Sequence, residues 1–175
     1  SEGEGPFVNV EYTSTNADTG EFFTDLGVIS GKNTGTITKT EVINLKNYAM
    51  YYNLKVDIPT SGWIQHLWLK SGGIAGENTG TVSNNVFIGR IRGVAKNNNM
   101  YLATFGGQTL NKYLVGLYSV VSHYFGMITG DSSDGTSENN YAPNDIDKFM
   151  SIETENLKNY VRVGFDGDAE DSTND

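Results

Sequence analysis

Carboxylates are the residue type whose spacing in this chain comes closest to a recognisable chemistry. Near the C-terminus they alternate with small residues, as at the start of a calcium-binding loop, and two more lie in an acidic turn upstream. The candidate ligands for Ca2+ are Asp131, Asp134, Asp166, Asp168, Glu170 and Asp171. The downstream Glu and the flanking helices of an EF-hand are missing. Ca2+ is therefore the one cofactor that we expect, and a solvated acidic loop and tail is the alternative.

Catalytic arrangements find little support in the sequence. The two histidines, His66 and His123, lack the spacing of a zinc pair, and the absence of cysteine excludes thiolate nucleophiles, disulfides and Cys-based zinc sites. The segment 130–135 resembles a trypsin-like Gly-Asp-Ser-Gly only superficially, because Ser132 is followed by Ser133 rather than by glycine. No Gly-rich phosphate-binding loop is present. We therefore expect a protein that is not an enzyme.

The charge balance limits the partners. With 12 Lys+Arg against 21 Asp+Glu the net charge is -9, so neither nucleic acid nor an anionic membrane surface is an expected partner. No stretch approaches the roughly 18 apolar residues of a membrane span. The chain opens Ser1-Glu2-Gly3-Glu4, as in a mature product after removal of a signal peptide or in a trimmed chain. We expect an extracellular or cell-surface location.

Strands must position these residues, because the periodic segments are rich in Val, Ile, Tyr and Phe and are separated by Gly, Asn, Thr and Ser. The clearest strand is 49–58, in which Met50, Tyr52 and Leu54 share one face. A strand at 63–70 follows the turn 59–62, and this pair is predicted to form a hairpin.

The whole pattern predicts a single all-β domain. Further strands are expected at 7–12, 21–29, 36–45, 82–94, 100–105, 113–127 and 160–165. A short helix is expected after Asn144, with Ile146, Phe149 and Met150 as its apolar side. We predict a jelly-roll-like β-sandwich with at most one or two short helices. Residues 1–12 would be an N-terminal segment, 13–165 the sandwich and 166–175 an acidic tail.

Two internal repeats stand out. The segment Gly31–Ile37 reappears 45 residues later as Gly76–Val82, each with a Gly-x-Asn-Thr-Gly turn before a strand, and Asn-Leu-Lys-Asn-Tyr occurs at 44–48 and 156–160. Two similar turns that serve one kind of β-connection would explain the first repeat. A solenoid repeat is the alternative.

Part of the chain resembles a known family. The run Asp25–Ile29, a glycine-rich turn, Thr38–Asn47 and then Tyr52–Ile58 is similar to the opening of the camelysin/TasA-type exported fibre proteins, which archaeal bundling-pilus and cannula subunits also resemble. The resemblance covers roughly residues 20–70. It implies a jelly-roll subunit that forms a homo-oligomer by donor-strand exchange. The implied subunit interface is the alternating strand with Phe7, Val8, Val10 and Tyr12; an ordinary first strand in its own sheet is the alternative.

A second family competes. Residues 72–82 are similar to the GLUG motif of bacterial surface adhesins and some secreted peptidases, and 27–37 and 126–130 match it more loosely. Three true repeats would imply a β-solenoid, although their spacings of 45 and 54 residues are unequal.

Together these features favour a structural protein. We expect a protomer of an extracellular filament, tube or biofilm fibre that assembles by β-strand complementation between subunits. The alternative is a surface adhesin or carbohydrate-binding module that contacts the cell surface or a glycan. Its stacking platforms would be Trp68, Tyr51 and Tyr118.

Overall fold

The computed structural model describes residues 6–14, 21–56, 66–97, 102–105, 108–111, 120–155 and 158–167. Its main elements are two sheets, each with a row of four paired strands. One face, called sheet A here, contains β1 (Val8–Ser14), β5 (Glu41–Val56), β9 (Val86–Asn97) and β14 (Met150–Glu155), in that order. The other, sheet B, contains β2 (Glu21–Gly27), β6 (His66–Gly72), β12 (Val120–Asp131) and β15 (Lys158–Asp166).

The corners between these faces are built from shorter strands. They are β3 (Ser30–Asn33), β4 (Thr36–Thr38), β7 (Ala75–Asn78), β8 (Thr81–Ser83) and β13 (Thr136–Glu138). β10 (Leu102–Phe105) and β11 (Gln108–Asn111) form a separate antiparallel pair. The helix α2 (Ile146–Phe149) directly precedes β14, so a short helix is confirmed here, although its N-cap is Asp145 rather than Asn144 and Met150 already belongs to β14.

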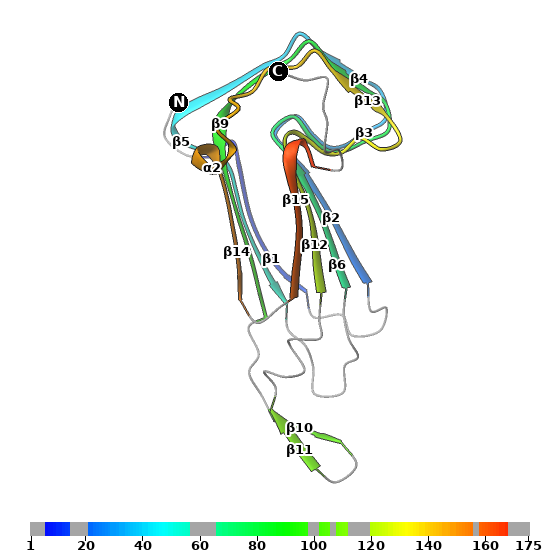
Figure 1. The fold of residues 1–175 in the computed structure, drawn as a ribbon, viewed down its shortest axis with the longest axis vertical. Coiled ribbons are helices and arrows are strands. Elements are labelled where there is room, and N and C mark those ends of the chain that lie inside the picture. Colours follow the sequence, from blue (N-terminus) through cyan, green and yellow to red (C-terminus); the bar gives the residue numbers. More distant parts are fainter. Residues whose placement is uncertain are drawn as a thin grey trace.

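The chain is wound into parallel coils. Each strand of sheets A and B pairs in parallel with the corresponding strand of the next coil, as do β4, β8 and β13 (Figure 1). β2 and β6 pair 45 residues apart, and β6 and β12 pair 54 residues apart. The unequal repeat spacings of the sequence are therefore the lengths of successive coils, and the fold is a parallel β-solenoid.

The all-β prediction is confirmed, but the jelly-roll sandwich is not, because a jelly roll is built from antiparallel strands. The predicted hairpin of 49–58 with 63–70 is wrong. β5 pairs with β1 and β9 in sheet A, whereas β6 pairs with β2 and β12 in sheet B. The alternation of buried and exposed side chains along each strand was predicted correctly. The strand that pairs with it, however, lies in the neighbouring coil and not across the next turn.

The core lies between sheets A and B and consists of the inward-facing residues of both. Met50, Tyr52 and Leu54 are buried, as the alternation predicted. The Tyr52 hydroxyl lies 3.2 Å from Ser71 Oγ across the core, and its ring meets Phe125 edge-on at 6.4 Å. Burial raises the pKa of Tyr52, so the phenol stays neutral. These contacts tie sheet A to sheet B.

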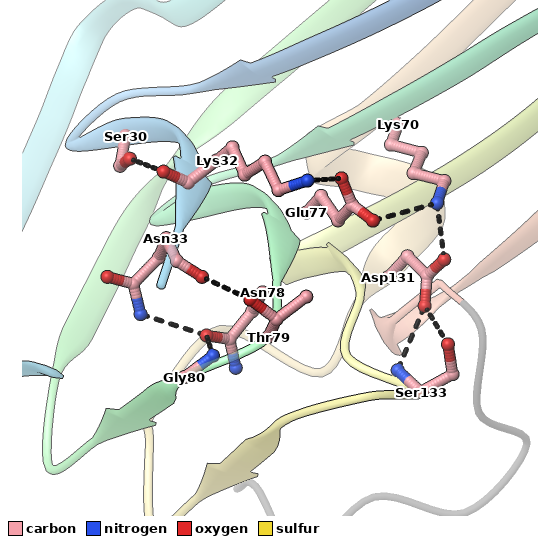
Figure 2. A network of polar contacts seen from close by, with 10 residues as sticks. All are labelled: Ser30, Lys32, Asn33, Lys70, Glu77, Asn78, Thr79, Gly80, Asp131 and Ser133. Carbon is pink, nitrogen blue, oxygen red and sulfur yellow. Dashed lines mark hydrogen bonds and ion pairs between the residues drawn. The ribbon is translucent and has the colours of Figure 1, made fainter. Parts of the chain in front are cut away.

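Asparagine ladders explain the repeated Gly-x-Asn-Thr-Gly turn (Figure 2). Asn33 Nδ2 donates to Asn78 Oδ1 at 2.9 Å, and Asn78 Nδ2 donates to the carbonyl of Thr136 at 2.9 Å. At another corner, Asn85 Nδ2 donates to Asn140 Oδ1 at 3.0 Å. Each amide therefore satisfies buried backbone or side-chain groups of a neighbouring coil. The two copies of the turn are stacked coils, as the solenoid alternative required.

The same corner also repeats a strained backbone. Three residues at this corner have φ between +55° and +57°. Asn84 and Asn139 directly precede the ladder residues Asn85 and Asn140, and Lys39 is the equivalent residue of the first coil. Asparagine tolerates this left-handed region better than lysine does. The same backbone conformation of the turn is therefore repeated in all three coils.

We expect Asn78→Ala to lower the free energy of unfolding by about 2 kcal/mol, because it removes the hydrogen bonds of Asn78 with the Asn33 amide, the Gly80 N–H and the Thr136 carbonyl in a buried corner. Thr79→Ala is the matched control: Thr79 is exposed, and the variant loses only a long hydroxyl contact of 3.4 Å to the Asn33 carbonyl, which keeps the backbone N–H of residue 79 at 2.9 Å. Urea unfolding of both variants measures the difference. Equal stabilities would show that the ladder contributes nothing.

Candidate subunit interface

The last rung of the solenoid is formed by β14 in sheet A and β15 in sheet B. Within the described part of the chain, β14 pairs only with β9 and β15 only with β12, so the outer edge of each strand has no strand beside it. Val161 and Val163 pair with the buried His123 and Phe125, and they therefore face inward. Even so, they are 39% and 45% exposed, because none of the described strands forms a further coil over them.

A cavity opens at this end of the core. Its volume is about 310 Å3. It is lined by Phe125, Ile146, Asp147, Met150, Ile152, Val161 and Val163. Six of these seven side chains are apolar, so the cavity has the character of an unfinished core layer rather than of a polar ligand site.

The first rung is formed by β1 and β2. Among the described residues β1 pairs only with β5 and β2 only with β6, so these edges also lack a neighbour. Val8 and Val10 pair with the buried Met50 and Tyr52 and pack half-buried against the core, whereas Phe7 is 49% exposed. Tyr12 lies in the same strand, paired with Leu54. The N-terminal strand thus lies in its own sheet, as the ordinary-first-strand alternative held.

Aromatic rings stack along the outward face of sheet B. Phe23 and Trp68 stack with their centroids 6.4 Å apart, and Trp68 stacks on Tyr124 at the same distance. Each ring is therefore covered on at least one face by the ring of a neighbouring coil. Phe23 is the outermost of the three, and it is 68% exposed at the open edge of β2.

Charged side chains form a network beside these rings (Figure 2). Lys70 Nζ lies 2.6 Å from Asp131 Oδ2 and 3.6 Å from Glu77 Oε1, and Lys32 Nζ lies 3.4 Å from Glu77 Oε2. Despite the cost of its own burial, hydrogen bonds from Lys70 and Ser133 lower the pKa of Asp131. Asp25 differs from Asp131, because partial burial and the nearby Glu77 carboxylate raise its pKa.

The six predicted calcium ligands are not brought together by the described part of the chain. Asp131 pairs with Lys70, and Asp134 lies in the following turn. Asp166 is buried and accepts hydrogen bonds from Thr129 Oγ1 at 2.6 Å and Ser137 Oγ at 2.8 Å. Asp168, Glu170 and Asp171 lie outside the described residues. Among the described residues no group of three or more His, Asp or Glu side chains is placed to hold a metal ion.

The predicted glycan platforms are likewise dispersed. Trp68 lies within the stack on sheet B, whereas Tyr51 faces outward from sheet A with the guanidinium carbon of Arg92 5.7 Å from its ring centroid. Tyr118 lies outside the described residues. Of the residues that line the open end, the sequence analysis named Ile146 and Met150, as part of the apolar side of the helix. It did not name Val161 and Val163, although their alternation in the predicted closing strand was the signal that could have found them.

No family model matches this chain, and neither a curated protein nor a solved structure matches it. In the described part of the chain, no helix has the length and apolar character needed to cross a membrane.

Proposed function

We propose that this protein is a structural protomer of an extracellular filament, tube or biofilm fibre, and that its copies stack end to end through their β-strand edges. The observation that carries the proposal is the pair of open solenoid ends. β14 and β15 of one copy present two unpaired parallel edges, and β1 and β2 of the next copy present two more in the same sheets.

The registers of the two ends are compatible. Val8 and Val10 belong to the same inward columns of sheet A as Met150 and Ile152, since each pairs through β5 and β9. In a stacked pair they would extend the core layer over the open cavity. Exposed strand edges favour such pairing, because their backbone N–H and C=O groups find partners without any refolding.

This mode of assembly differs from donor-strand exchange. β1 stays paired with β5 of its own chain and uses its other edge for the next copy. Completing the burial of Val161 and Val163 contributes on the order of 1 kcal/mol each, since both are already more than half buried. Association costs exceed this, so backbone pairing along both sheets must supply the rest.

Val163→Asp tests the proposal. The carboxylate would be desolvated inside the joint, so we expect filaments seen by negative-stain microscopy to disappear and sedimentation to show monomers. Tyr51→Asp is the control, because Tyr51 faces outward from β5 at a position flanked by β1 on one side and by β9 on the other. Circular dichroism checks that both variants fold.

Wild-type protein that stays monodisperse at every concentration would overturn the proposed function. So would a Val163→Asp variant that assembles as the wild type does. A deletion of residues 1–12 should likewise abolish assembly, because it removes most of the strand that would pair with β14.

Calcium is proposed as an aid to assembly rather than as a built-in cofactor. The chain carries a net charge of -9, so like copies repel each other at neutral pH. Glu11 would oppose Glu153 of the preceding copy, because both belong to one outward column of sheet A. Ca2+ would relieve this repulsion by binding carboxylate oxygens. Assembly should therefore respond to millimolar calcium chloride more than to sodium chloride of equal ionic strength.

A surface adhesin that binds glycans is the second candidate. The row of Phe23, Trp68 and Tyr124 favours it, because aromatic rings are common platforms for apolar sugar faces. It ranks second, since the stacked rings turn their edges rather than their faces outward, with the outer face of Phe23 as the exception. Glycan binding by a monodisperse protein would support it.

A further inference from the structure

One outward column of sheet B links all four of its rungs. Asp25 in β2, Lys70 in β6, Tyr124 in β12 and Arg162 in β15 are in register. Lys70 Nζ lies 5.7 Å from the centroid of the Tyr124 ring, and the guanidinium carbon of Arg162 lies 5.7 Å from the same centroid. A ring is thus flanked by cations from the strands on either side of it.

The two ends of this column carry opposite charges. Asp25 lies at the open edge of β2, and Arg162 lies exposed at the open edge of β15. The ammonium group nearest to Asp25 along the column, that of Lys70, is already 2.6 Å from Asp131. The raised pKa of Asp25 is consistent with this, because burial and Glu77 outweigh the attraction of Lys70 and Lys32. Among the described residues, the Asp25 carboxylate therefore has no ion-pair partner within its own copy.

We propose that Arg162 of one copy forms an ion pair with Asp25 of the next copy and thereby fixes the register of the joint between β15 and β2. This inference rests on the proposed end-to-end assembly. Continued in the same register, the column brings these two residues opposite each other. A shift of one residue would turn every side chain to the wrong face, and a shift of two would oppose Arg162 to Phe23 or Gly27.

Among the described residues, sheet A would bring no pair of opposite charges together at the joint that could select one register. Its outward columns would oppose Glu153 to Glu11 and Ser151 to Asn9 of the next copy. Arg92 Nη2 lies 3.2 Å from Glu153 Oε1 and offsets part of that repulsion. The attraction that selects one register therefore comes from sheet B, where the guanidinium of Arg162 would meet a carboxylate with which it can form two parallel hydrogen bonds.

Charge reversal tests the pair. Arg162→Glu and Asp25→Arg should each raise the critical concentration for assembly at least about tenfold, which corresponds to about 1.4 kcal/mol per joint. The double variant, with both charges exchanged, should return to within about threefold of the wild type, because only the direct contact is restored. Light scattering over a concentration series measures this, and thermal melting of dilute monomers checks that each variant folds.

Lys55→Glu is the control, since it makes the same charge change on β5, an inner rung of sheet A. We expect it to shift the critical concentration far less than Arg162→Glu does. Assembly of Arg162→Glu at the wild-type concentration, or a double variant no better than the single ones, would overturn the ion pair while leaving end-to-end assembly intact. A wild-type protein that never assembles would instead overturn the proposed function and, with it, this inference.

Discussion

Gly126→Ala should destabilise the protein by at least about 3 kcal/mol, measured by urea unfolding. Gly126 lies in β12, where the chain turns away from sheet B, and a Cβ there would overlap with the carbonyl oxygen of Thr129 and lie 2.9 Å from that of Phe165. Both obstacles are backbone atoms held in ladders, so neither can move cheaply. The expected loss is a large fraction of the total stability of a domain of this size.

The corresponding glycines of the earlier coils meet the same obstacle. A Cβ at Gly27 would overlap with the carbonyl oxygen of Ser30, and one at Gly72 with that of Ala75. In each coil the chain approaches itself three residues later. Glycine is therefore required by the coil turn itself and not by one local irregularity.

Gly35→Ala is the matched control. A Cβ at Gly35 would have only Asn33 Oδ1 near it, at 4.0 Å, and its backbone is not left-handed. We expect stability between that of the wild type and a gain of about 1 kcal/mol, because alanine restricts the unfolded chain. Equal stability of Gly126→Ala and Gly35→Ala would show that the close approach at the turn is not needed for folding.

His123→Leu should remove a large part of the pH dependence of stability. His123 is 1% exposed, and neither of its ring nitrogens has a hydrogen-bond partner in the described part of the chain. Its register neighbours in the adjacent coils, Leu69 and Val161, are apolar. Burial lowers the pKa of His123 from 6.5 to about 4, so the folded protein holds the imidazole neutral.

The sign follows from this lowered pKa. Below pH 6.5 the unfolded chain binds a proton that the folded protein does not bind until about pH 4. The wild type should therefore lose about 3 kcal/mol as the pH falls through this window, and the loss should level off below it. At pH 7.5, His123→Leu should already be more stable by about 1 kcal/mol, since two unpaired buried polar atoms are gone.

Unfolding by urea at pH 7.5, 6, 5 and 4 gives the measurement. The carboxylates titrate alike in both proteins, so the difference between the two curves isolates His123. Parallel curves would mean that the folded protein accommodates the imidazolium, and would contradict its burial without a partner.

The all-β fold class could be predicted from the sequence, because the alternation of apolar and polar residues along a strand is a local property. The buried face of β5 follows from side-chain spacing alone, and the short helix lies where it was expected, although its N-cap is Asp145 rather than Asn144 and makes no side-chain capping hydrogen bond. The predicted closing strand 160–165 lies within β15. Strand partners could not be predicted, because 37 to 59 residues separate the positions that pair between neighbouring coils and side-chain alternation is the same in parallel and antiparallel sheets.

The repeat of Gly-x-Asn-Thr-Gly contained the missing information. Its spacing of 45 residues equals one coil, and its asparagines form the ladder of Asn33 and Asn78. An asparagine that bonds to the backbone of its own turn and one that bonds to the next coil can have the same local sequence. The repeat by itself therefore could not distinguish two similar turns from a solenoid. The third coil replaces the motif by Asp131–Gly135, and this hid the pattern further.

The sequence by itself determined that this chain is acidic, free of cysteine and built of alternating strands, because these properties belong to residues and their nearest neighbours. Only the tertiary structure decided that the strands stack in parallel coils and that Val161, Val163, Asp25 and Arg162 lie at open ends. Whether a valine is covered, or a carboxylate lacks a cation, depends on which strand lies beside it. That choice is made by packing between distant segments and not by the local pattern.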